Sequence, residues 1–219
     1  MFFSILLPSK NGENYIGNVI KSILDQEFQD YEIIVGDNNN TNKFIEIINS
    51  FKSTKIKVIR SEKTLQVADS WTNCLNVSSG RYIITLGDDD CLLINGLNKI
   101  HYLLEKNNFP DCVSVNGIGF YEAGSTEDFI YPGYKLNFWE YKNKYLNDLF
   151  LSNELKEKIV KEFFSFNNLL PLNMQPHIFS KEIADSIENG IFKPPSPDSY
   201  ALHSMLMKKK KWAISNEKI

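Results

Sequence analysis

The stretch FFSILLPSKNGENYIGNVIKSILDQEFQDYEIIVGD, which runs from Phe2 to Asp37, decides the fold. It opens on an apolar run that ends at Pro8, and such a run predicts a short strand buried on both faces. Apolar residues then recur at helical spacing between Glu13 and Gln26, which predicts an amphipathic helix. A second apolar run, Tyr31 to Val35, predicts the next strand. Strand, helix and strand in this order form the unit from which parallel sheets are built.

The same alternation continues to about residue 115. Further helices are expected near 44–51, 67–75 and 97–104, and further strands near 56–59, 81–86 and 112–115. Connections of this kind are right-handed and place helices on both faces of the sheet. We therefore expect an α/β fold with a mainly parallel sheet that is covered on both faces.

The second half of the chain is less regular. Residues 119–137 indicate a loop or irregular hairpin, and residues 143–167 indicate one or two helices over the sheet. A strand near 174–180 and a short helix near 181–187 follow. The Pro-rich segment 193–197 cannot be helical and predicts a rigid extended approach to a helix over 198–207. We expect one domain over 1–219, with 1–115 and 116–219 as its two halves.

Composition narrows the class of protein. The 219 residues carry 24 Lys and Arg against 27 Asp and Glu, a net charge of −3, which argues against a nucleic-acid-binding protein. The 3 cysteines are widely spaced, which fits a reducing compartment rather than a disulfide framework. The sequence contains no apolar run long enough for a membrane span and no targeting segment, so we expect a cytoplasmic protein.

Polar side chains follow several of the expected strands, at the edge where such sheets bind ligands. Three adjacent carboxylates, Asp88, Asp89 and Asp90, come directly after a buried strand and repel one another unless a cation or protons intervene. Mn²⁺ or Mg²⁺, held by one or two carboxylates and by substrate phosphates, would relieve this repulsion. The run Asn38–Asn40 has a simpler explanation, because Asn residues form turns.

Other nucleotide-binding motifs are absent from the sequence. No G-x-G-x-x-G follows the first strand, and no G-x-x-x-x-G-K-[ST] occurs, which argues against a dinucleotide dehydrogenase and a P-loop enzyme. A G-x-S-x-G nucleophile turn is also missing. The combination of carboxylates with a sheet favours an enzyme that neutralises a diphosphate by means of a metal.

At this point the chain resembles a known family. ILLPSKNGENYIGNVIKSILDQEFQDYEIIVGDNN (Ile5–Asn39) and SSGRYIITLGDDD (Ser78–Asp90) are similar to the spaced motifs that open family-2 glycosyltransferases, which have the GT-A fold. The similarity covers about the first hundred residues. Further on, PSPDSYALHSML (Pro195–Leu206) resembles the acidic residue that precedes a helix in one branch of these enzymes.

The resemblance implies a role for several residues by position. Pro8, Lys10 and Asn11 would line the pocket for the base and ribose. Asp37 would receive the base at a uracil or guanine N–H.

In the acidic triplet, the resemblance implies that Asp89 approaches the ribose and Asp90 the metal. Asp88 would be an additional or outer carboxylate of the metal site. Asp198 would be the general base that removes the proton of the acceptor hydroxyl.

One departure from the family pattern matters. Many members carry Ala-Arg-Asn where this chain has Asp69-Ser-Trp-Thr-Asn73, so the usual diphosphate contact is missing or comes from Lys10 or Arg81. Trp71 then reads as a core residue. Asp198 also has a second explanation as a helix N-cap, a position that would lower its pKa.

Two other features have open interpretations. His177 would contact phosphate or acceptor, or else serve a structural role. The run Lys208–Lys211 either complements the dipole of a helix end or touches an anionic lipid surface.

The expected function is inverting transfer of a sugar from a nucleotide-diphosphate donor, with UDP favoured, to a hydroxyl of a glycan or lipid-linked glycan. This would serve surface polysaccharide synthesis at the inner face of the membrane, with peripheral membrane contact and no nucleic acid. The alternatives are a sugar nucleotidyltransferase, which would want a Gly-rich basic first loop, and a non-catalytic sugar- or nucleotide-binding module.

Overall fold

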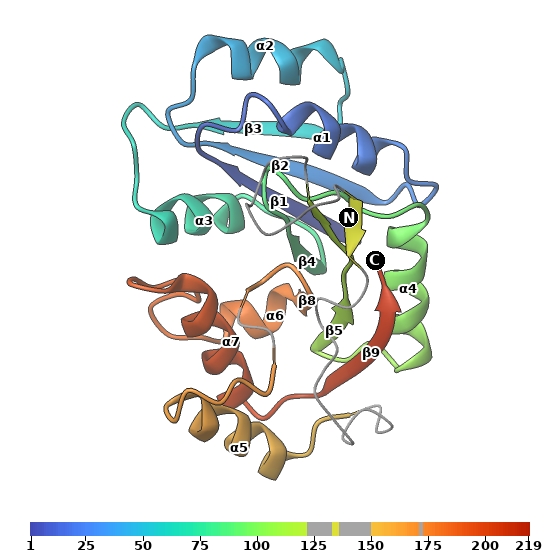
Figure 1. Cartoon of the computed structure of the whole chain (residues 1–219), viewed down its shortest axis with the longest axis vertical. Coiled ribbons are helices and arrows are strands. Elements are labelled where there is room, and N and C mark those ends of the chain that lie inside the picture. The colour runs from blue at the N-terminus through green and yellow to red at the C-terminus, as the bar shows by residue number, and fades with distance from the viewer. Residues whose placement is uncertain (122–132, 136–149, 171–172) are drawn as a thin grey trace.

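The computed structural model describes residues 1–121, 133–135, 150–170 and 173–219. A seven-stranded sheet has the order β3-β2-β1-β4-β8-β5-β9, and β6 and β7 form a separate hairpin (Figure 1). The strands are β1 (Phe3–Ser9), β2 (Tyr31–Asp37), β3 (Ile56–Arg60), β4 (Tyr82–Thr85), β5 (Cys112–Asn116), β6 (Gly119–Tyr121), β7 (Gly133–Lys135), β8 (His177–Ser180) and β9 (Trp212–Lys218). The helices are α1 (Ile16–Leu24), α2 (Asn42–Ser50), α3 (Val67–Asn76), α4 (Gly96–Lys106), α5 (Asn153–Phe163), α6 (Lys181–Asp185) and α7 (Pro197–Met207).

All strand pairs of the large sheet are parallel except those of β8, which runs antiparallel to both β4 and β5. The expected α/β class and the mainly parallel sheet are confirmed. The reversal of β8 has a consequence for the site, because it brings the start of β8 to the edge where the parallel strands end.

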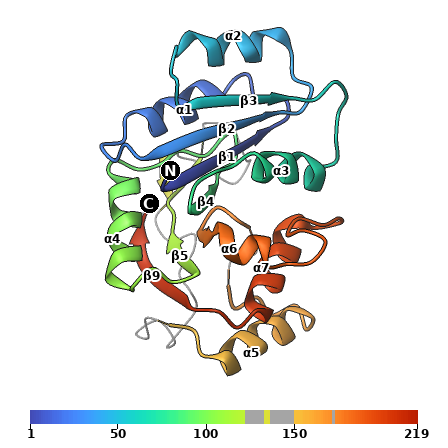
Figure 2. The ribbon, with the colours of Figure 1, turned by 180° about the vertical axis from the view of Figure 1, so that it is seen from behind.

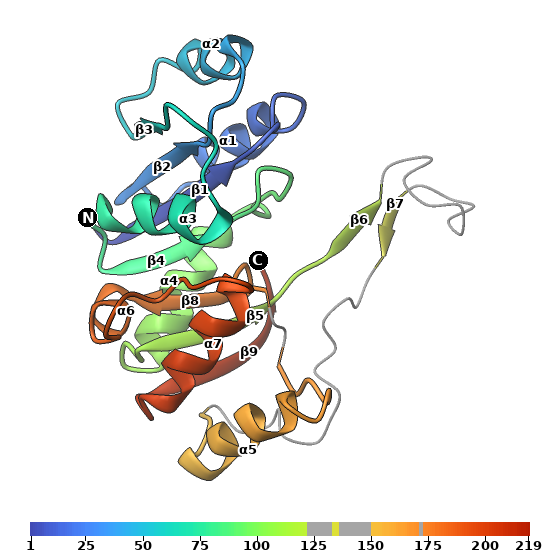
Figure 3. The ribbon, with the colours of Figure 1, turned by 90° about the vertical axis from the view of Figure 1, so that its left-hand side faces the viewer.

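Alternate residues of β1 face two different cores. Phe3, Ile5 and Leu7 pack with α1, α2 and α4, whereas Leu6 packs with α3, α6 and α7 on the other face. Figures 2 and 3 show these two helical layers on opposite sides of the sheet. Burial on both faces explains why the strand reads as a continuous apolar run.

Some boundaries differ from the expectation. Helix α1 begins at Ile16 rather than near Glu13, because Tyr15 N–H donates to the Gly12 carbonyl and closes a turn first. Helix α5 packs beside α7, not over the sheet. Strand β9 was not expected, and it pairs with β5 in parallel. The remainder of the expected hairpin and helical segments, residues 122–132 and 136–149, lies outside the described residues.

Residues 193–196 of the Pro-rich segment are not helical and contain a cis bond between Pro194 and Pro195, whereas Pro197, also predicted to be non-helical, begins a helix. The segment leads into α7, whose first residue is Pro197, a position that suits proline because its missing N–H has no partner there. Within the described ranges, none of the helices has the length and apolar character needed to cross a bilayer.

Two glycines give a matched test of the packing. A Cβ on Gly80 would lie 2.6 Å from the Phe3 carbonyl carbon, whereas a Cβ on Gly17 would make an ordinary 3.5 Å contact with Ile47. Gly80→Ala should therefore lower the free energy of unfolding by about 1–3 kcal/mol through overpacking. Gly17→Ala, inside α1, should raise it by about 0.5–1 kcal/mol. Urea titrations monitored by circular dichroism measure both, and equal effects would contradict the close approach at Gly80.

Candidate active site

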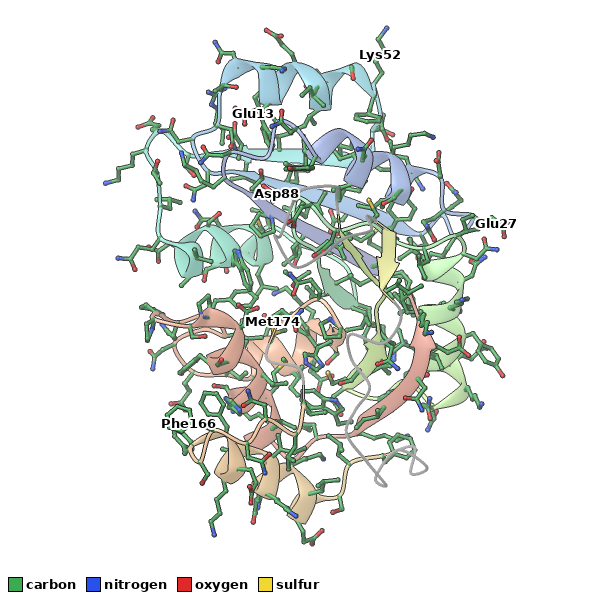
Figure 4. All side chains as sticks on the ribbon, viewed as in Figure 1. Glu13, Glu27, Lys52, Asp88, Phe166 and Met174 are labelled. Atoms are coloured by element: carbon green, nitrogen blue, oxygen red, sulfur yellow. The ribbon has the colours of Figure 1, made fainter. Side chains whose placement is uncertain are left out.

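The site lies at the carboxyl edge of the sheet. Strand β1 ends at Ser9, paired with Asp37 at the end of β2, and β4 runs into the acidic triplet 88–90. Figure 4 shows Asp88 in the half of the molecule built from β1 to β4 and Met174, just before β8, in the half that contains α6 and α7. The topology thus brings together residues from both halves of the chain.

Asp37 is fully buried at this edge. Its Oδ1 accepts hydrogen bonds from the Asn40 backbone N–H at 2.8 Å and from the Asn40 side-chain amide at 3.0 Å. Its Oδ2 lies 3.4 Å from Arg60 Nε at the end of β3, and it has no hydrogen-bond partner. One oxygen of Asp37 therefore holds the turn, and the other faces the Arg60 guanidinium without a hydrogen bond.

The turn residues near Asp37 do more than reverse the chain. Asn38 exchanges two hydrogen bonds with the backbone of Leu65, at 2.7 and 3.1 Å. Asn40 donates to the Ser9 carbonyl and accepts from the Asn11 N–H. Both Asn38 and Asn40 are buried, so they connect the loops after β1, β2 and β3 into one wall.

The three residues predicted to line the base and ribose pocket lie along this wall. Pro8 pairs with Gly36 across β1 and β2. Lys10 donates from Nζ to the Asn39 carbonyl and to Thr64 Oγ1, both at 3.2 Å. Asn11 has a φ of 62°, a conformation that Asn adopts more readily than most residues, and it leads directly into Gly12.

The acidic triplet is partly buried and locally crowded. Asp88 Oδ2 accepts from Ser9 Oγ at 2.5 Å, and Asp90 Oδ2 accepts from the Gly87 N–H at 3.0 Å. Burial raises the pKa of both carboxyl groups, and the neighbouring charge of Asp89 raises each pKa further. The three neighbouring carboxylates therefore destabilise one another electrostatically, and a bound cation would reduce this destabilisation.

The carboxylates of the triplet could hold a hard divalent cation only if other ligands complete its coordination. Among the described residues, no three His, Cys, Asp or Glu side chains converge as metal ligands. A Cβ on Gly87 would lie 2.8 Å from both Asp89 Oδ1 and Asp90 Oδ2, so two carboxylate oxygens flank one small space. Mg²⁺-type sites commonly use one or two carboxylates and complete their shell with substrate phosphates and water. The predicted metal role of Asp88 and Asp90 stays a prediction.

Asp198 lies in the first turn of α7, close to the segment before β8. Its Oδ1 accepts from the Met174 N–H at 2.9 Å, and burial raises its pKa. The N-cap explanation is wrong, because Ser196 occupies that position and Asp198 lies two residues further into the helix. The lowered pKa expected from capping is not found either, because burial shifts it in the opposite direction.

One residue links this carboxylate to the triplet. The Gln175 side chain lies close enough to the Asp90 carboxylate to lower its pKa, and the neighbouring Met174 N–H donates to Asp198. The Gln175 Oε1 atom is buried and has no hydrogen-bond partner. Two adjacent residues therefore connect the donor-side carboxylate with the proposed base.

The structure also decides some open interpretations. Arg81 lies at the start of β4, over the Phe109 ring at 4.5 Å, so it is at the opposite edge from the triplet and cannot replace the missing diphosphate contact. His177 is fully buried, and its Nδ1 lies 2.8 Å from Ser114 Oγ, which also accepts from Trp212 Nε1. Trp71 packs edge-on against Phe192. His177 and Trp71 are thus structural.

Sequence reasoning missed Arg60, Met174 and Gln175. Arg60 was accessible in principle, because it directly follows the predicted strand 56–59 and polar residues at strand ends line such sites. Met174 and Gln175 gave no signal, since their importance depends on β8 running antiparallel between two strands that are distant in sequence.

The doubly covered sheet, with carboxylates at its carboxyl edge, defines a GT-A-type nucleotide-binding enzyme fold. The sequence profile of the family described as glycosyl transferase family 2 matches residues 4–163. The chain belongs to this family, as its opening motifs indicate.

Two relatives and one solved structure illustrate the similarity. The chain is 30% identical over 105 residues to the Escherichia coli UDP-Glc:alpha-D-GlcNAc-diphosphoundecaprenol beta-1,3-glucosyltransferase WfgD, a match that covers 48% of this chain and 42% of that protein. It is 26% identical over 174 residues to the GalNAc(5)-diNAcBac-PP-undecaprenol beta-1,3-glucosyltransferase of Campylobacter jejuni, covering 69% and 56% of the two chains. The chain thus spans about half the length of these relatives.

Among solved structures, residues 1–349 of Staphylococcus aureus TarS superpose with a TM-score of 0.76 at 15% identity. This match covers 100% of the chain and 59% of the TarS chain. The superposition supports the assigned fold.

Proposed function

We propose that the chain transfers a sugar from a UDP-linked donor to a hydroxyl group of a lipid-linked glycan, with inversion at the anomeric carbon. The observation that carries this proposal is the link between Asp90 and Asp198 through Gln175 and Met174. Two partly buried carboxylates on opposite sides of one short segment suit a reaction that needs a charge-stabilising group for the donor and a base for the acceptor.

On the donor side, residues 1–115 would bind the nucleotide. The Oδ2 of Asp37, which is ion-paired with Arg60 and has no hydrogen bond, would accept the imino N–H of uracil, while Pro8, Lys10 and Asn11 line the base and ribose pocket and Asp89 approaches the ribose. Residues 116–219 would bind the acceptor. The names of the relatives from E. coli and C. jejuni, both acting on undecaprenol-linked glycans, support a lipid-linked acceptor.

Asp198 would act as the base. The Met174 N–H fixes the orientation of the carboxylate, and burial raises its pKa, which makes it a better proton acceptor than an exposed aspartate. Direct displacement needs no protein nucleophile. As the acceptor oxygen attacks the anomeric carbon, its proton passes to Asp198 and the nucleoside diphosphate departs.

Asp90, with Asp88 as an additional carboxylate, would hold Mn²⁺ or Mg²⁺. When bound, such an ion offsets the negative charge that develops on the departing diphosphate. A lipid-linked acceptor also places the reaction at a membrane surface, for which we propose the cytoplasmic face because nucleotide-sugar donors are made in that compartment.

The proposal is tested first with a panel of nucleotide-sugars. Transfer to a synthetic GlcNAc-diphosphate-lipid should occur with at least one UDP-sugar, and it should be detected by mass spectrometry of the lipid product. The absence of both transfer and donor hydrolysis across the panel, together with retained UDP binding, would instead support the non-catalytic binding module.

Asp37→Asn tests the base contact. Asn retains an acceptor oxygen for Asn40 but replaces the ligand-facing oxygen by a donor group. We expect calorimetry to show a loss of about 1.5–3 kcal/mol in UDP binding, the usual value of a charge-assisted hydrogen bond. CDP offers an acceptor at the same ring position, so its affinity should be reduced less. Equal losses for the two nucleotides would reject the contact.

Asp90→Asn tests the metal. The variant keeps an acceptor for the Gly87 N–H, so the fold should survive, but the enhancement of UDP binding by Mn²⁺ should disappear and turnover should fall by about 10². Glu105→Gln, exposed on α4, is the control and should behave as wild type. A Mn²⁺ enhancement that persists in Asp90→Asn would remove this residue from the metal site.

Asp198→Asn tests the base. Transfer should fall by about 10²–10⁴ while calorimetric UDP binding stays unchanged. Because the folded-state pKa is raised above its usual value of 3.8, the folded protein binds the proton more tightly, and stability falls as pH rises through the raised pKa. The uncharged variant should therefore melt no earlier than wild type at neutral pH.

The raised pKa of Asp198 also sets the direction in which the transfer rate changes with pH. The wild-type rate should decline as pH falls through the raised pKa of Asp198, because the base becomes protonated. A variant that is stable and transfers sugar at the wild-type rate would show that Asp198 is not the base.

A further inference from the structure

The loop after α5 presents two large apolar side chains to solvent. Phe164 is 75% exposed and Phe166 is 98% exposed. Their neighbours point inward: the Phe163 ring lies 4.3 Å from the His203 ring of α7, and Leu170 belongs to the core. Figure 4 shows Phe166 at the outer margin of the molecule. The fold thus anchors this loop while most of both exposed rings stays in water.

The backbone at Phe166 makes this exposure more informative. Phe166 N–H donates to the Phe163 carbonyl at 2.9 Å and Asn167 N–H donates to the Glu162 carbonyl at 3.0 Å, which is the Schellman pattern of helix ends. Phe166 occupies its left-handed position, with a φ of 57°. Glycine usually stands there, because a bulky side chain is strained in this conformation. The Phe166 side chain gains almost no contact within the described chain in return, which points to a contact outside it.

Helix α5 and the end of α7 are rich in lysine although the chain is acidic overall. Residues 150–170 and 203–212 contain seven lysines and three glutamates, whereas the whole chain carries a net charge of −3. Lys156 is buried, and Lys209 pairs with Glu157, which holds the end of α7 against α5. The exposed lysines of these segments are Lys158, Lys161, Lys208, Lys209, Lys210 and Lys211, of which Lys208 and Lys211 also donate from Nζ to the Ser186 and Asn107 carbonyls. Aromatic rings among lysines match the interface of an anionic bilayer.

The loop also lies on the acceptor side of the molecule. Helix α5 packs along α7, and Phe163 at the end of α5 contacts His203 in the middle of α7, the helix that carries Asp198 in its first turn. From this loop the chain returns to Met174, whose N–H holds Asp198. Figure 3 shows α5 as an outlying element below the sheet. A bilayer that contacts this loop would therefore lie beside the proposed base.

We propose that Phe164 and Phe166 insert into the interfacial region of an anionic phospholipid bilayer, with the exposed lysines of α5 and the end of α7 against its headgroups. The proposal rests on the proposed function only in that it places a lipid-linked acceptor within reach of Asp198. A second copy of the chain is a poorer occupant, because a symmetric contact would place the same lysines against one another.

Vesicle flotation tests the surface without donor or acceptor. The wild-type chain should float with vesicles that contain phosphatidylglycerol in phosphatidylcholine, and it should bind vesicles of phosphatidylcholine alone more weakly. Added salt should reduce binding to the anionic vesicles, because it screens the lysines. Failure of the wild-type chain to bind anionic vesicles would overturn the proposal.

Phe166→Gly is the decisive variant. It should reduce the partition coefficient for anionic vesicles by about tenfold, since it removes one inserted ring. It should also raise Tm by about 2 °C, because glycine suits the left-handed position. Phe164→Ser should lose a similar factor in binding. Tyr102→Ser, which removes a ring that is 57% exposed on α4, is the matched control and should bind as wild type.

Further outcomes separate the membrane-binding surface from the proposed function. Wild-type vesicle binding by Phe166→Gly would overturn the proposal, as would a concentration-dependent dimer that the two Phe variants abolish. Vesicle binding that depends on both rings in a chain that binds no nucleotide would support this surface and reject the proposed function. Nucleotide binding and sugar transfer to a soluble acceptor, without vesicle binding, would support sugar transfer and reject the membrane-binding surface.

Discussion

The pairing of β8 between β4 and β5 is the constraint on which the rest of the structure depends. The six other strands of the sheet run in one direction, and β8 alone runs in the other. Because of this reversal, the residues that precede β8 arrive at the edge where the parallel strands end. Met174 and Gln175 can then contact Asp198 and Asp90 at once. A parallel β8 would have delivered these residues to the opposite edge, beside Arg81.

Unsatisfied electrostatics mark this edge of the sheet. The carboxyl groups of Asp88, Asp90 and Asp198 all have raised pKa values through burial, and Asp37 keeps one oxygen without a hydrogen-bond partner. Buried carboxylates are costly when they are charged, so their gathering at one edge makes this edge a candidate ligand site. The rest of the sheet is apolar on both faces and provides the rigidity that such a site needs.

The first half of the fold was predictable because its signals are local. The strands from β1 to β4 are mostly apolar, and each helix between them has an apolar stripe, so the pattern of apolar residues locates them. The carboxylates after β4 follow from the same reasoning. Strand β9 could not be predicted, since Trp212 is followed by both polar and apolar residues without a clear period. Its pairing with Cys112 depends on tertiary packing. The Gln175 contact and the exposed Phe166 depend on three-dimensional packing in the same way.

The place of β9 also bears on how the chain folds. Strands β1, β2 and β3 pair with partners that are near in sequence, so this part of the sheet can form early. The outer strand β9 cannot form early, because it pairs with β5, which is distant in sequence. The pairing of Trp212 with Cys112 requires closure of the long loop between them. During synthesis on the ribosome, β4 and β5 therefore have open edges until β8 and β9 emerge. This interval leaves the open edges of β4 and β5 available for pairing with other nascent chains.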